Sequence, residues 1–203
     1  NALAIDNGYK VIIIIAGNKT NLLNQTTKRL RQQLGYSNNE IAILTTSERI
    51  QSIRSDYISR LIEVGKSVII TILKHQDHID HLSEVFTSPE LRSLPTLIID
   101  DEGDQASLNT ARRRNAKSTV YSSINNLRAR FSNHSYVAFT ATPQANLLIS
   151  TLDELHPRFC VLIEPGKGYT GGSTFHGIDE GLYNISIPDN EVGFDEEGEH
   201  GIP

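Results

Sequence analysis

The sequence predicts an α/β fold in which a mostly parallel sheet is covered by helices on both faces. Short β-branched runs alternate along the chain with segments of helical periodicity, as in repeated β-α-β units. The runs are apolar throughout, which is typical of strands buried on both faces. A length of 203 residues allows one core of ordinary size with an appendage.

Five segments have the composition of buried strands. They are residues 10–16, 41–45, 67–73, 95–101 and 136–140. A sixth strand is expected at 159–164, where the alternation of strands and helices weakens. In a parallel sheet the carboxyl ends of the strands share one edge, and ligands bind there. Residues that follow these five segments are therefore the first candidates for a site.

Four segments between the strands have apolar residues at spacings of three and four, the helical pattern. They are residues 20–34, 47–64, 76–86 and 118–131. Thr20 is expected to cap the first helix and Gly35 to end it, and Gly65 is expected to end the second.

Charge and cysteine content describe a chain without a membrane segment or an internal disulfide. There are 24 acidic and 19 basic residues, and six of the acidic ones lie among the last fifteen residues, so the remaining body is close to neutral. The longest apolar run, 11–16, is far shorter than the roughly 20 residues of a membrane helix. The single cysteine, Cys160, suits a reducing compartment, and a cytoplasmic location is expected.

We expect three parts along the chain. Residues 1–2 resemble the remnant of an expression tag, residues 3–150 form the α/β domain, and residues 151–203 form an extension with a glycine-rich segment and an acidic tail. The absence of methionine from the sequence also suggests an excised piece of a longer protein.

The strongest chemical signal is an apolar strand that runs directly into carboxylates, Leu97-Ile98-Ile99-Asp100-Asp101-Glu102-Gly103-Asp104. Phosphoryl-transfer enzymes use such a strand end because one carboxylate holds Mg²⁺ and an adjacent one orients the attacking water. The spacing assigns Asp101 to the metal and Glu102 to the water. An acidic turn without a chemical role is the alternative.

A second strand end carries small hydroxyl residues, in the sequence Tyr136-Val137-Ala138-Phe139-Thr140-Ala141-Thr142-Pro143. Together, the Asp-Glu-x-Asp and Thr-Ala-Thr-Pro segments resemble motifs II and III of superfamily 2 helicases and translocases. The resemblance implies that Asp104 bonds the hydroxyls of Thr140 and Thr142 and so couples the nucleotide to domain movement. If both strands belong to one parallel sheet, Asp104 should lie within about 3 Å of one of these hydroxyls, directly or through a water.

A third segment, residues 12–26, resembles motif Ia, in which a strand end and a helix start grip a nucleic-acid backbone. Free N–H groups at a helix start, together with Lys19, make a plausible phosphate site. Asn18, Lys19 and Gln25 are the expected nucleic-acid-binding residues. An ordinary capped helix is the alternative.

More narrowly, three segments resemble the Z1 domain of large bacterial and phage proteins that are linked to restriction and defence and classed as endonucleases. They are Ala-Gly-Asn-Lys-Thr-Asn-Leu-Leu-Asn-Gln-Thr from Ala16, Ile-Asp-Asp-Glu-Gly-Asp-Gln-Ala-Ser-Leu-Asn-Thr from Ile99 and Phe-Thr-Ala-Thr-Pro-Gln-Ala-Asn from Phe139. The resemblance covers about residues 10–175. It implies a RecA-like, P-loop NTPase-like domain that hydrolyses ATP with Mg²⁺ on a nucleic acid, taken to be DNA.

The sequence contains no phosphate loop. Gly65-Lys66-Ser67 has Arg60 where the first glycine is required, and Gly166-Lys167-Gly168 lacks the hydroxyl residue. The resemblance implies that the loop and its strand lie upstream and that the isolated chain is inactive. Because this strand sits centrally in RecA-like sheets, its loss is expected to leave flanking strands unpaired. These edges must then close on each other, accept a strand from elsewhere in the chain, or pair with another molecule by self-association.

Two rival functions stay open at this point: a metal-dependent nuclease centred on the same acids, and a non-hydrolysing scaffold in a defence complex.

Three weaker features have ordinary explanations. His75, His78 and His81 could bind a metal, but a solvated helix face is favoured. Asp153, Glu164 and Lys167 resemble a restriction-nuclease core with a spacing one residue too long, and Arg112–Arg114 are expected in a solvated loop that could touch phosphate.

Overall fold

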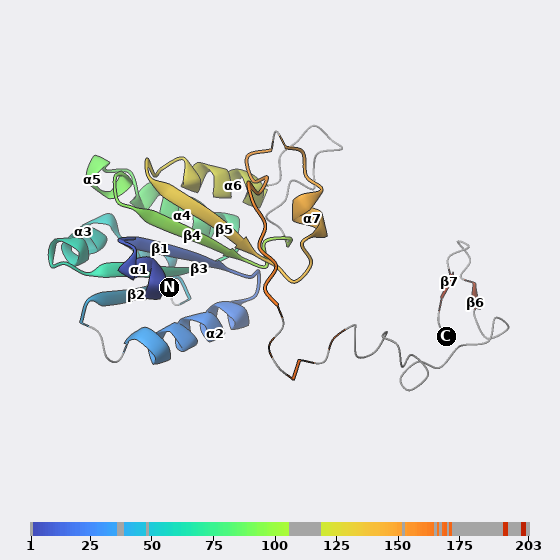
Figure 1. The fold of residues 1–203 in the computed structure, drawn as a ribbon. Coiled ribbons are helices and arrows are strands. Elements are labelled where there is room, and N and C mark those ends of the chain that lie inside the picture. Colours follow the sequence, from blue (N-terminus) through green and yellow to red (C-terminus); the bar gives the residue numbers. More distant parts are fainter. Residues whose placement is uncertain are drawn as a thin grey trace. The chain divides into compact units, whose positions relative to one another are not determined.

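Five parallel strands form one sheet, as predicted. They are β1 (Val11–Ala16), β2 (Ile41–Thr45), β3 (Ser67–Leu73), β4 (Thr96–Asp101) and β5 (His134–Phe139). Their order in the sheet is β2-β3-β1-β4-β5, and every neighbouring pair is parallel (Figure 1). In the register, Ile14 of β1 lies opposite Thr71 of β3 and Ile99 of β4. All carboxyl ends therefore lie along one edge of the sheet.

The computed structural model describes residues 2–35, 39–47, 49–105, 119–151, 153–164, 166, 168–169, 171, 193–194 and 200–201. The chain divides into two compact units, residues 1–158 and 159–203. The first contains the sheet and its helices. In the second, the described strands are β6 (Gly193–Phe194) and β7 (His200–Gly201), which pair antiparallel.

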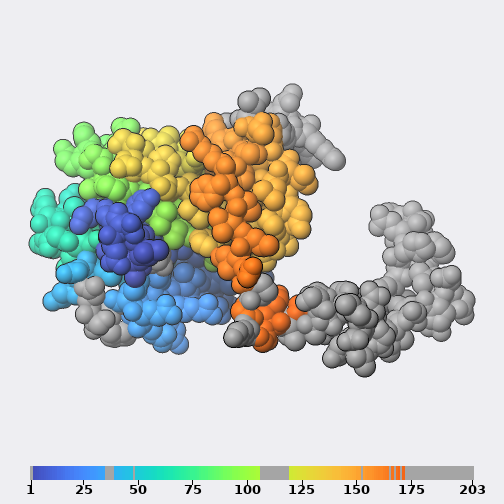
Figure 2. Space-filling model, in the orientation of Figure 1, coloured from blue at the N-terminus to red at the C-terminus, as the bar shows by residue number. Residues whose placement is uncertain are grey.

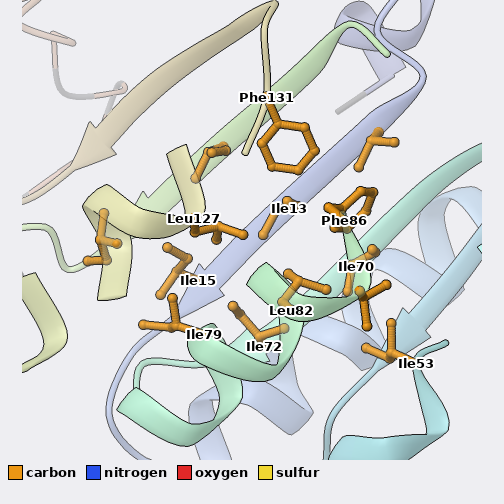
Figure 3. Packing of buried hydrophobic residues seen from close by; sticks show 14 of the residues in the cluster. Ile13, Ile15, Ile53, Ile70, Ile72, Ile79, Leu82, Phe86, Leu127 and Phe131 are labelled. Carbon is orange, nitrogen blue, oxygen red and sulfur yellow. The ribbon is translucent and has the colours of Figure 1, made fainter. Parts of the chain in front are cut away.

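One face of the sheet is covered by α3 (Ser55–Glu63), α4 (Gln76–Val85), α5 (Pro89–Arg92) and α6 (Thr119–Arg128). Their apolar sides pack on alternate residues of β1 and β3, as Ile13, Ile15, Ile70 and Ile72 show in Figure 3. Phe86 and Phe131 lie beside these isoleucines with ring centroids 4.8 Å apart. This is the larger of the two apolar cores, and it fixes β1 and β3 at the centre of the domain.

The other face is covered by α1 (Ala2–Asp6) and α2 (Thr20–Leu30), which a short π-helix (Arg31–Gly35) extends. Ile12, Ile14, Leu30 and Ile69 form the buried core on this side, with Ile5 packed against it. Figure 2 shows α1, in dark blue, lying on the surface of the domain. The expected arrangement of helices on both faces is thus confirmed.

Several local expectations were wrong. Residues 47–64 are not one helix, because a 3₁₀ turn (Ile50–Ser52) precedes α3. Lys19 rather than Thr20 is the N-cap residue of α2, and it makes no side-chain capping bond. Residues 159–164 include no strand, and Phe159 and Leu162 are mostly exposed.

The described strands pair without a gap in the middle of the sheet, which is the first of the three alternatives. β1 occupies the centre and is bonded to β3 on one side and β4 on the other. The edges are β2 and β5. Among the described residues, no helix is long and apolar enough to cross a bilayer.

Candidate functional site: the acidic turn after β4

The acidic residues form a tight turn at the carboxyl end of β4. Asp101 is the last residue of the strand, and Glu102 follows with a left-handed backbone (φ 56°), a conformation that non-glycine residues seldom adopt. Next, the Gly103 N–H donates to the Phe139 carbonyl at 2.9 Å. The turn, called here the acidic turn (residues 101–105), is therefore bonded directly to the end of β5.

Asp104 contacts both hydroxyl residues that follow β5. Its carboxylate accepts the Thr140 hydroxyl at 2.6 Å and the Thr142 hydroxyl at 2.7 Å. The Thr142 N–H in turn donates to the Thr140 hydroxyl oxygen at 2.9 Å. The expected distance of about 3 Å is thus confirmed. The Thr140 and Thr142 hydroxyls lower the pKa of Asp104 because they stabilise its charged form.

Gly103 allows the acidic turn to pack closely against β5. A Cβ at this position would lie 2.7 Å from the Cβ of Ala138, closer than carbon atoms can pack. The Asn146 side chain, in α7 (Gln144–Leu147), donates to the Gly103 carbonyl at 3.2 Å. Any larger residue at 103 would push the acidic turn away from β5.

Behind the acidic turn lies a buried polar group that none of the predicted sites includes. The Lys74 ammonium is 2.8 Å from Asp100 Oδ1, and both side chains are fully buried. The Tyr136 hydroxyl donates to Asp100 Oδ2 at 2.6 Å. Burial first, and the Asp100 carboxylate second, raise the pKa of Tyr136 well above its usual value, so the phenol remains a hydrogen-bond donor.

A signal for this group was present in the sequence. In a strand, successive side chains point to opposite faces, so Asp100 and Asp101 cannot both face solvent. One of the two must enter the core and find a cation, because an unpaired buried charge is costly. Lys74 is the residue that directly follows the buried strand β3. The burial pattern of β4, in which Thr96, Ile98 and Asp100 are buried, shows this alternation.

The expected nucleic-acid-binding residues lie after β1, which neighbours β4 in the sheet. Asn18, Lys19 and Gln25 are all exposed. Asn18 and Lys19 form the turn into α2, and Gln25 lies in that helix. Their segment thus begins at the same edge as the acidic turn, one strand away.

The described residues contain no group of three His, Cys, Asp or Glu side chains that could hold a metal. His78 instead bonds the Thr46 hydroxyl at 2.7 Å, and His81 bonds the Ile53 carbonyl at 2.9 Å. Both are half-buried, so the expectation of a solvated histidine face was wrong for these two. His75 caps α4 by accepting the Asp77 N–H.

Magnesium bound to a nucleotide has different requirements. It needs only one or two protein carboxylates because phosphates and waters supply the remaining ligands. Asp101 and Glu102 are partly exposed at the open edge of the sheet, so they fit this donor set.

The remaining candidates from the sequence are Asp153, Glu164 and Lys167, together with Arg112–Arg114. Asp153 accepts the Tyr121 hydroxyl at 3.0 Å and belongs to the first unit, whereas Glu164 belongs to the second. Lys167, Arg112–Arg114, Ala106 and Ser107 lie outside the described residues.

A scan against protein-family models finds no match to this chain, and a search of curated proteins finds none either.

Proposed function

We propose that the chain forms most of the first RecA-like domain of a nucleic-acid-dependent ATPase of the Z1 type. The observation that carries the proposal is the Asp104 carboxylate, which accepts hydroxyl bonds from both Thr140 and Thr142. This contact joins an acidic turn suited to Mg²⁺ to a second strand end 36 positions later. The motif resemblance implies the same contact between the same types of residue.

The acidic turn provides two carboxylates with separable roles. When bound, Mg²⁺ would supply positive charge that counters the negative charge of the ATP phosphates. Asp101, at the end of β4, would hold the metal through water. Glu102 would accept a proton from a water molecule whose oxygen attacks the γ-phosphorus, as the bond from phosphorus to the β,γ-bridging oxygen breaks. ADP and inorganic phosphate are the products.

Asp104 would transmit the state of the nucleotide. Its position two residues after Glu102 means that a small movement of the acidic turn changes its bonds to Thr140 and Thr142. These threonines precede α7, so a rearrangement would be passed to that helix. The exposed Lys19 and Asn18, one strand away, would contact the nucleic-acid backbone.

Because these 203 residues contain no phosphate loop, another segment of polypeptide would have to supply the loop and its strand. The edge of the sheet that can accept this strand is β5. Among the described residues, no strand pairs with β5 on the side away from β4. With strands about 4.8 Å apart, a strand added to β5 would lie about 10 Å from β4, against about 19 Å for one added to β2. The added strand could belong to the same protein, and self-association through β5 is the alternative.

The test is steady-state phosphate release by the full-length protein with Mg²⁺, with and without duplex DNA. We expect DNA-stimulated release and no cutting of DNA in the absence of ATP. Metal-dependent cutting without ATP, lost in Asp101→Asn, would support the nuclease instead. Absence of both release and ATP binding would support the scaffold. The 203-residue chain alone is expected to release no phosphate, because its sequence has no phosphate loop.

A further inference from the structure

Lys74 has more partners than a buried ion pair requires. Besides Asp100 Oδ1, its ammonium donates to the main-chain carbonyls of Asp101 and Glu102, each at 2.6 Å, and of Gln105 at 3.2 Å. All three carbonyls belong to the acidic turn. An ammonium has three N–H donors, so most of its hydrogen-bonding capacity goes to the backbone of this turn and not to the carboxylate.

The turn needs such a partner because its backbone departs from the common conformations. Glu102 has φ 56°, which is unfavourable for a residue with a Cβ and persists only where the surroundings enforce it. The carbonyls on both sides of the Glu102 α-carbon, those of Asp101 and Glu102 itself, point to the same ammonium. Both peptide planes that define the Glu102 conformation are therefore fixed by one side chain.

The base of the Lys74 side chain is fixed as well. Its own N–H donates to the carbonyls of Ala16 at 3.0 Å and Gly17 at 3.2 Å, at the end of β1. β1 lies between β3 and β4, so Lys74 spans from the end of one strand across a second to the turn after a third. A lysine anchored at both ends in this way can set the position of the turn relative to the whole sheet edge.

We propose that Lys74 is a positioning residue, an internal cation that holds the backbone of the acidic turn in the left-handed conformation that presents the Asp101 and Glu102 carboxylates. Its significance for ATP hydrolysis rests on the proposed function, whereas its effect on the turn does not. The competing explanation is that Lys74 only neutralises Asp100. In that case, removing both charges together would leave the turn unchanged.

The experiment compares isotope-labelled samples of the chain by NMR. Asp100→Asn keeps the ammonium and removes the carboxylate charge, and the double variant Lys74→Met/Asp100→Asn removes both charges without leaving either unpaired. Lys10→Met, at an exposed lysine at the opposite edge of the sheet, is the matched control. The measurements are the ¹³Cα and ¹³Cβ shifts of Glu102, which report its φ, and the amide exchange of Gly103.

We expect Asp100→Asn and Lys10→Met to retain the left-handed shifts of Glu102. In the double variant those shifts should be lost, and Gly103 exchange should accelerate at least about tenfold while β1 amides change little, as for local opening. Native Glu102 shifts and native Gly103 exchange in the double variant would overturn the proposal. So would loss of the turn in Asp100→Asn alone.

A measurement on the unmodified chain covers the case in which the double variant does not fold. Scalar couplings through hydrogen bonds should connect Lys74 Nζ to the carbonyl carbons of Asp101 and Glu102. Coupling to the Asp100 carboxyl carbon alone would overturn the proposal. None of these readouts involves nucleotide, so failure of the ATPase proposal and failure of this one are distinguishable.

Discussion

The Asp104 carboxylate and the Thr140 hydroxyl are 2.6 Å apart, although 36 positions separate them in the chain. They meet because β4 and β5 are adjacent and parallel, with Asp101 opposite Phe139 in the register. Each residue lies just beyond the end of its strand. The contact thus follows from the order of the strands, and the bond from the Gly103 N–H to the Phe139 carbonyl keeps the acidic turn at the end of β5.

The pKa of Asp104 provides a test of this contact in solution. Because the Thr140 and Thr142 hydroxyls stabilise the carboxylate, its pKa should lie below the ordinary 3.8, and in Thr140→Val/Thr142→Val it should rise toward that value. The stabilisation is present above pH 3.8 and is lost as pH falls through the lower pKa of the folded state. Titration of the Asp104 ¹³Cγ signal measures the shift. Thr151→Val, at an exposed threonine, is the control, and an unchanged pKa in the double variant would contradict the contact.

Tyr136→Phe tests the bond from the phenol to Asp100. Losing a hydrogen bond to a buried carboxylate should lower the free energy of unfolding by about 1.5–3 kcal/mol. The pKa of Tyr136 in the folded state is raised above its ordinary value of 10.0. The Tyr136 hydroxyl therefore stabilises the folded state fully below pH 10, and this stabilisation is lost as the pH rises through the raised pKa. Urea denaturation at about pH 7 and about pH 11 measures both effects. Tyr57→Phe, at a tyrosine that is 43% exposed, should show neither effect.

Gly103→Ala tests the close approach of the acidic turn to β5. The added Cβ would lie 2.7 Å from that of Ala138, and overpacking of this kind costs about 1–3 kcal/mol. Ala138→Gly removes the opposing carbon. In the Ala138→Gly background, Gly103→Ala should therefore lower the free energy of unfolding much less than it does in the original chain. Thermal or urea unfolding of the four proteins gives this coupling energy. Additive losses would indicate that the two positions are not in contact.

Lys19→Ala tests the nucleic-acid segment. If Lys19 contacts a phosphate, its loss should weaken binding of duplex DNA and reduce the slope of log K against log salt by about 1. Fluorescence anisotropy over a range of salt concentrations provides the measurement. Lys10→Ala is the matched control, because Lys10 is also exposed but precedes β1 and so lies at the opposite edge of the sheet. Equal effects of the two variants would point to non-specific attraction.

The sheet and the principal contact could be predicted because they depend on local patterns and one topological rule. Runs such as Val11–Ala16 are buried at every position and read clearly as internal strands. The alignment of strand ends then brings Asp104 to Thr140. The helix starts were less predictable, since Thr20 has the composition of a cap but Lys19 occupies that position.

The buried charge group was missed because it depends on which strands are neighbours. Lys74 follows β3, and Asp100 is the next-to-last residue of β4. These two strands are not adjacent, because β1 lies between them. Asp100 lies in the acid-bearing motif, where only Asp101, Glu102 and Asp104 were given roles, and Lys74 belongs to no motif. The strand predicted at 159–164 failed for the opposite reason: the segment has the right composition, but its apolar side chains, such as Leu162, are mostly exposed, so no core stabilises a strand there.

Glu102→Gln in the full-length protein tests whether Glu102 is the base for ATP hydrolysis, because the amide keeps the size of the side chain but cannot accept a proton. We expect ATP turnover in the presence of DNA to fall about 10²–10⁴-fold, while ATP affinity, measured by equilibrium binding, stays within a few-fold of the original. Glu90→Gln, at an exposed glutamate in α5, should change neither. Turnover that persists in Glu102→Gln at the original rate would contradict the assignment of the acidic turn to ATP hydrolysis.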